Sequence, residues 1–249
     1  AARARREANP APEPWSARIG SRCPICLEDW DMNTSRKFQV CCCRTICNSC
    51  SMKIQGPCAL CGEVLPDSDA ALVAKLRRHV EDEIPEAVTH LGMKYDIGDL
   101  GLVKSKKKAA KLYKRGAELG DVIAMLNLGN MYERGQGVKL DRKKALQLYR
   151  LPADRGHAVA QCNLANLLHR AGHVEEAVKY WRKAAEQDYG PACMSLGIEY
   201  ANGNNLERDL DEAKRLISRA AATGLEIAAQ FLAQINAQSQ WDGTLNVTY

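Results

Sequence analysis

The chain has 249 residues, of which 46% are hydrophobic and 26% are charged, and its formal net charge is +5. These values are those of a globular protein and exclude a wholly disordered chain, while an aromatic content of 6% favours helices packed through small residues over a β-sandwich core. No run of about 18 apolar residues occurs, so we expect no membrane-spanning helix.

The N-terminal segment is rich in Ala and Pro and holds five Arg against two Glu in residues 1–22. Such a composition predicts a disordered basic tail. The segment lacks the basic, apolar and small-residue order of a secretory signal, so we expect a cytoplasmic or nuclear protein. This expectation applies to the chain as it stands, which begins at Ala1 rather than Met.

Nine of the eleven cysteines lie between residues 23 and 61. Their short, paired spacing without a secretory signal favours metal binding over disulfides. Two residues between thiolates let both sulfurs reach one ion, and four thiolates complete a tetrahedral zinc site. Two zinc ions need eight ligands, so one cysteine is surplus. The nine are Cys23, Cys26, Cys41, Cys42, Cys43, Cys47, Cys50, Cys58 and Cys61.

This cysteine module is too short to bury a sizeable apolar core, and Pro24, Gly56 and Pro57 interrupt it. The metal must therefore supply much of its folding energy. Closed all-thiolate sites leave no open position for substrate or water, so we expect two structural zinc ions and no catalytic residue.

The order of these ligands, together with the opening CPICLEDW, resembles the RING finger family over residues 23–61. The resemblance implies a small cross-brace zinc finger over residues 23–66. One ion would be bound by Cys23, Cys26, Cys47 and Cys50. The other would be bound by Cys58, Cys61 and two of Cys41, Cys42 and Cys43. The usual family spacing favours Cys41 with Cys43, whereas a double-cysteine form would use Cys41 with Cys42; Arg44 stands at the usual His position.

RING fingers recruit a ubiquitin-conjugating enzyme, and the resemblance implies that Ile25, Met52 and Ile54 contact that enzyme. The chain would then be a RING-type ubiquitin ligase. Ala59 replaces a frequent Pro, and Gly62 replaces a basic residue that holds conjugated ubiquitin in many active members. A non-catalytic zinc-finger scaffold is therefore the alternative.

Residues 67–85 predict a helical connector, because Asp67 and Ser68 can cap a helix there, and Pro85 either ends that helix or begins the next one at its first position. Further on, residues 104–115 hold seven bases and no acid. Such a run can attract nucleic acid, but Leu112 and Tyr113 interrupt it at core-like spacing. We therefore favour a solvated helix face and expect no nucleic-acid partner.

Two motifs recur along the rest of the chain. KAAKLYKRGAELG around Ala109 returns around Ala145, Ala177 and Ala213, at steps of 36, 32 and 36 residues. HLGMKYDIG returns in step, and each period holds two amphipathic segments. Such helix hairpins bury their apolar faces against their neighbours, so the sequence predicts a mainly α fold, an α-solenoid that follows the zinc finger.

The array resembles the Sel-1-like repeats, relatives of the tetratricopeptide repeat, most closely in LGNMYERGQGVKLDRKKALQLYRLPADRG. The resemblance implies four repeats and a capping helix over residues 86–238, with a protein substrate or partner on the concave face. The third repeat lacks the glycine loop. Repeated aromatics such as Trp181 are expected to pack, Cys162 and Cys193 are expected to be buried, and residues 239–249 to form a flexible tail.

Overall fold

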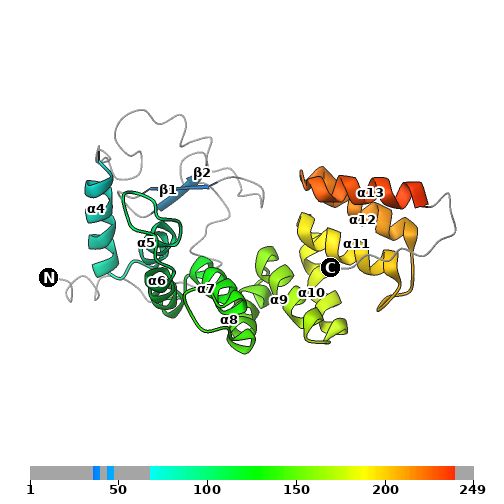
Figure 1. The fold of residues 1–249 in the computed structure, drawn as a ribbon, viewed down its shortest axis with the longest axis horizontal. Coiled ribbons are helices and arrows are strands. Elements are labelled where there is room, and N and C mark those ends of the chain that lie inside the picture. Colours follow the sequence, from blue (N-terminus) through cyan, green and yellow to red (C-terminus); the bar gives the residue numbers. More distant parts are fainter. Residues whose placement is uncertain (1–35, 40–43, 48–67, 239–249) are drawn as a thin grey trace. The chain divides into compact units, whose positions relative to one another are not determined.

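A computed structural model describes residues 36–39, 44–47 and 68–238 (Figure 1). Within these residues the fold is mainly α, as predicted. The helices are α4 (Asp69–Glu81), α5 (Pro85–Ile97), α6 (Lys106–Glu118), α7 (Val122–Arg134), α8 (Arg142–Asp154), α9 (Ala158–Arg170), α10 (Val174–Glu186), α11 (Gly190–Asn202), α12 (Leu210–Ala222) and α13 (Glu226–Gln238). None of the described helices combines the length and apolar character that crossing a membrane requires.

A short antiparallel hairpin lies within the predicted zinc finger. It pairs β1 (Arg36–Gln39) with β2 (Arg44–Cys47), and Arg36 stands opposite Cys47. The rest of the predicted zinc finger, and the predicted tails at 1–22 and 239–249, lie outside the described residues.

Helix starts follow from local capping. The Ser68 hydroxyl accepts a hydrogen bond from a backbone N–H of α4, and the Ser105 hydroxyl accepts one from a backbone N–H of α6. At the start of α7, the Asp121 carboxylate accepts a hydrogen bond from Ala124 N at 2.6 Å. Pro85 begins α5, where a backbone N–H would have no helical partner. The start of each of these helices is therefore specified by its own capping residue or first-position proline.

The chain divides into two units, residues 1–145 and 146–249, with the boundary inside α8. In the first unit α4 packs on α5, α5 on α6 and α6 on α7, around a core that includes Leu76, Val88 and Leu91. In the second unit α9 to α13 pack in chain order, each on the next, around a core that includes Ile217 and Phe231. Each unit is an array of helix hairpins, as the repeats predict.

Recurring glycines let paired helices approach closely. A Cβ added to Gly92 on α5 would lie 2.8 Å from the Tyr113 ring of α6. One added to Gly197 on α11 would lie 2.7 Å from Ile217 of α12. Both distances are shorter than carbon atoms tolerate, so these positions admit no side chain without a shift of the helices.

The second helices end at a left-handed residue, which is Gly120, Gly156 or Gly224 in three repeats, with φ angles of 88°, 89° and 84°. In the third repeat Asp188 takes this conformation, with φ 54°. The Asp188 carboxylate accepts two bonds from the Arg219 guanidinium on α12, which holds the strained residue in place.

The connector helix α4 behaves as the second helix of a preceding repeat. Arg77 of α4 donates to the Tyr95 hydroxyl at 3.3 Å, and Arg182 of α10 donates to the Tyr200 hydroxyl at 3.1 Å. Both pairs are separated by 18 residues. The array of packed helices thus begins one helix before the first complete hairpin.

Candidate protein-binding surface

The loops between paired helices are closed by a recurring hydrogen bond. The backbone N–H groups of Ser105, Asp141 and Asp209 donate to the carbonyls of Tyr95, Tyr132 and Tyr200 at 2.8, 2.9 and 3.0 Å. In each case the donor precedes the second helix of its pair. The bond therefore fixes where the second helix begins relative to the tyrosine.

In the first unit this closure places a lysine over each tyrosine ring. Lys108 Nζ lies 5.2 Å from the Tyr95 ring centroid, and Lys144 Nζ lies 5.3 Å from that of Tyr132. Each lysine is the third residue of its helix. A cation at this distance from a partly exposed ring contributes about 0.5–1 kcal/mol.

The first turns of the second helices differ in charge between the two units. Helix α6 begins with Lys106, Lys107 and Lys108, and α8 begins with RKK, without an acid in either first turn. Helices α10 and α12 instead carry VEE and LDE there. Acids suit the positive end of the helix dipole and bases do not, so the first unit carries an unfavourable charge at both starts.

Large apolar side chains are exposed on the first helices of the hairpins in the first unit. Met93 and Ile97 of α5 are 40% and 63% exposed, and Ile123 of α7 is 43% exposed. These side chains are the candidate apolar contacts for a protein partner on the first helices.

In the second unit a buried carboxylate, that of Glu199, has a polar partner at each of its two oxygens. Glu199 of α11 is 2% exposed, its Oε1 lies 3.1 Å from His169 Nε2, and its Oε2 accepts from Asn205 at 2.8 Å. The His169 ring packs against Trp181 at 5.2 Å, and the Trp181 indole donates to Asn166 at 2.9 Å. This network joins α9, α10 and α11 in the repeat that lacks the glycine loop, where residues 171–173 alone connect α9 to α10.

The residues singled out in the sequence divide into three groups. Cys162 and Cys193 are buried, as predicted, and burial raises the pKa of the Cys162 thiol to about 12, so it is unreactive near neutral pH. Trp181 is buried as predicted, whereas Tyr95 and Tyr132 are half-buried and support a lysine. The lysine–tyrosine pairs were not predicted, although the recurrence of Lys at the third helical position was a visible signal.

The predicted zinc ligands and enzyme-contact residues are not placed by the structure. Cys47 lies in β2, where the backbone alone is described. Outside the described residues lie Ile25, Met52, Ile54, Cys23, Cys26, Cys41, Cys42, Cys43, Cys50, Cys58 and Cys61. In the part of the chain that is described, no three His, Cys, Asp or Glu side chains gather so that they could hold a metal ion.

The sequence matches the Sel1 repeat over four consecutive segments, residues 85–121, 122–157, 158–189 and 190–225. The chain belongs to the Sel1 repeat family. This confirms the repeats predicted from the sequence, and each matched segment begins within one residue of a first helix, α5, α7, α9 or α11. Sel1 repeats bind other proteins, so the repeat array is a protein-interaction scaffold.

Two solved structures share the fold. The Sel1 repeat protein from Oxalobacter formigenes is 26% identical, with a TM-score of 0.63 over 69% of this chain and 71% of that one. The protein c5321, a protective antigen of uropathogenic Escherichia coli strains, is 27% identical, with a TM-score of 0.64 over 72% of this chain. The Sel1 protein described here spans 39% of c5321. No curated protein matches the chain.

Proposed function

We propose that this Sel1 repeat protein is an adaptor: its repeats hold a protein partner, and its N-terminal cysteine module recruits a ubiquitin-conjugating enzyme. The observation that carries the first half is the set of four Sel1 repeats over residues 85–225. The second half rests on the order of the nine cysteines and on Ile25.

Partner binding by the repeats is supported by rigid packing beneath exposed apolar side chains. The close approach at Gly92 fixes α5 against α6, and Met93, the next residue, is 40% exposed. Ile123 of α7 is exposed in the same way. A surface held in one geometry loses little conformational entropy on binding. The first helices α5 and α7 are therefore the proposed partner face.

The cysteine module would hold two structural zinc ions. Four thiolates around each ion leave no coordination site for a substrate, so the zinc-bound cysteines would form no covalent intermediate with ubiquitin. The module would act by positioning the loaded conjugating enzyme near the partner bound to the repeats. Ile25, Met52 and Ile54 would provide the enzyme contact. Such an adaptor would work in the cytoplasm or nucleus.

The alternative is a non-catalytic scaffold, in which the zinc module docks proteins without ubiquitin transfer. Ala59 and Gly62 favour it, because active RING fingers often carry Pro and a basic residue at these positions. It predicts that Ile25→Ala leaves cellular function intact, whereas the ligase predicts that function is lost.

The experiment that separates the two is self-ubiquitination by the zinc-loaded full chain with a broad panel of conjugating enzymes. The ligase predicts ubiquitin chains with at least one enzyme, a large loss for Ile25→Ala, and complete loss for Cys23→Ser. Absence of transfer across the panel, by a chain whose zinc content is intact, would contradict the ligase and leave the scaffold.

A further inference from the structure

Around the start of α6 and the loop between α7 and α8, apart from Lys108 over the Tyr95 ring, six exposed bases have no acidic partner among the described residues, and we call these six the basic surface. Lys104 and Lys107 lie at the start of α6, and the others lie in or beside the loop between α7 and α8. The six are Lys104, Lys107, Arg134, Lys139, Arg142 and Lys143. Nearby Lys106 and Lys144, in contrast, pair with Asp96 and Asp141.

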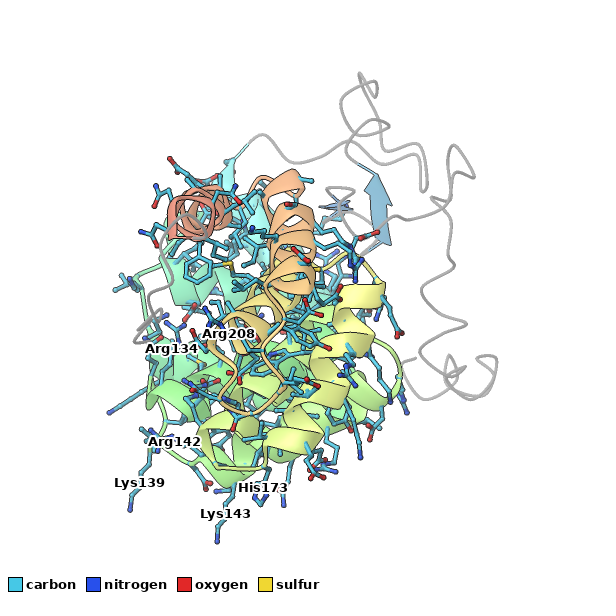
Figure 2. All side chains as sticks on the ribbon, turned by 90° about the vertical axis from the view of Figure 1, so that its right-hand side faces the viewer. Arg134, Lys139, Arg142, Lys143, His173 and Arg208 are labelled. Atoms are coloured by element: carbon cyan, nitrogen blue, oxygen red, sulfur yellow. The ribbon has the colours of Figure 1, made fainter. Side chains whose placement is uncertain are left out.

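The two groups of bases belong to one surface because the α7–α8 loop lies on the first turn of α6. A Cβ added to Gly137 in this loop would clash with the Lys106 carbonyl and lie 2.8 Å from the Lys106 Cβ. Gly137 also has φ 73°, so both its conformation and its contact require glycine. In Figure 2 the labelled side chains of Lys139 and Lys143 extend outward from the ribbon.

This concentration of charge is local. Residues 85–145 hold thirteen Lys and Arg against seven Asp and Glu, whereas residues 146–238 hold ten against eleven. The bases at the starts of α6 and α8 also face the positive ends of the helix dipoles. A bound anionic group would offset both sources of repulsion.

The surroundings of the basic surface favour a protein over a nucleic acid. Val103, beside Lys104, is 84% exposed, and Leu140, beside Lys139, is 51% exposed. Aliphatic side chains complement an apolar side chain of a peptide, not a phosphate backbone. Single-stranded nucleic acids bind through open aromatic faces, but Lys108 and Lys144 lie over the rings of Tyr95 and Tyr132.

We propose that the basic surface binds an acidic protein segment, with the six bases pairing with its carboxylates and Val103 and Leu140 contacting its aliphatic side chains. The inference rests on the proposed partner binding by the repeats and names the chemistry of that partner. In this proposal the loop between α7 and α8, whose conformation depends on Gly137, joins two repeats into one binding surface.

The test measures binding of a fluorescent peptide of alternating acidic and leucine residues to the zinc-loaded full chain, by anisotropy in about 0.1 M salt. The comparison probes are a peptide of equal length with Gln in place of the acids, and a single-stranded RNA. The variant K107E/K139E/K143E reverses three bases of the surface. The control R155E/K179E/K214E makes the same change of charge in the second unit.

The proposal predicts that the acidic peptide binds more tightly than the Gln peptide and the RNA, with an affinity that falls as salt rises. K107E/K139E/K143E should weaken the acidic peptide about tenfold and the control less than about twofold. V103S/L140S should weaken the leucine-bearing peptide and leave RNA binding unchanged.

Equal loss in both charge variants would show attraction by net charge alone and would overturn the proposal. Tighter binding of RNA than of the acidic peptide would assign the surface to nucleic acid and also overturn it. Either result would leave the proposed adaptor function intact if the full chain still transfers ubiquitin and still captures a partner through α5 and α7.

Discussion

At the scale of single residues, Asp188 shows how a rare backbone conformation can be supported by a distant side chain. Its φ of 54° falls where the other repeats use glycine, and Arg219 on the following hairpin holds its carboxylate. Asp tolerates the left-handed region better than most residues, because its short polar side chain can be satisfied there.

Two substitutions of Asp188 therefore distinguish the energetic cost of its backbone conformation from the contribution of its ion pair with Arg219. Asp188→Ala should lower the free energy of unfolding by about 1–2 kcal/mol, because alanine is strained at positive φ and cannot bind Arg219. Asp188→Gly relieves the strain while losing the exposed pair, so it should lie within about 0.5 kcal/mol of the native protein. Urea unfolding of both variants measures this, and equal stability of the alanine and native proteins would contradict the account.

A second effect at the scale of single residues is the dependence of stability on pH that the Asp121 carboxyl group produces. Burial raises the pKa of this carboxyl group to about 6. The hydrogen bond from Ala124 N has the opposite effect on the pKa, but it is smaller than the effect of burial. The folded state therefore binds the proton more tightly than the unfolded state does, so this group's contribution to stability falls as pH rises from about 4 to about 6.

Asp121→Asn removes the charge and keeps an equally good helix cap. The variant should be more stable than the native protein at pH 7.5 by about 1 kcal/mol, after allowance for solvent screening of a half-buried group, and the advantage should disappear near pH 4. Thermal melts at the two pH values provide the comparison. An advantage that persists unchanged at pH 4 would rule out the buried charge as its cause.

At the scale of helices, Gly116 is a point where three helices meet. A Cβ added there would lie 2.7 Å from Thr89 Oγ1 on α5 and 2.8 Å from the Ala124 Cβ on α7. Gly116→Val should lower the stability of the first unit by about 1–3 kcal/mol, because the helices must separate to admit it. The matched change Lys111→Val, on the exposed face of α6, should cost about 0.5 kcal/mol or less. Chemical unfolding followed by far-ultraviolet circular dichroism would compare them, and equal effects would contradict the packing argument.

The helices and their order could be predicted from the sequence because each repeat carries its own caps, its Leu-Gly motif and its glycine stop. Contacts between repeats could not be predicted from the sequence. Arg219 meets Asp188 across 31 residues, and the lysines meet Tyr95 and Tyr132 only after the loops close. The function of α4 as a leading second helix was hidden for the same reason, since the bond between Arg77 and Tyr95 is tertiary.

At the scale of the whole molecule, the zinc module and the repeats are proposed to fold by different means. The repeats bury their own apolar cores, whereas the cysteine module is proposed to depend on metal. A strong chelator should release about two zinc ions per chain, as eight thiolate ligands imply, while the helical signal and its melting temperature change little. Loss of the helical signal together with the metal would show that the repeats depend on the zinc module.

The central claim is that the repeats hold a protein partner on their first helices. A photoreactive amino acid placed at Met93 or Ile123 tests it directly in cells, with exposed Lys179 on the second helix α10 as the control. The account predicts that the two first-helix positions cross-link to the same discrete partner and that the Lys179 position does not. Cross-linking that is equal at all three positions, or absent from both first-helix positions, would contradict it.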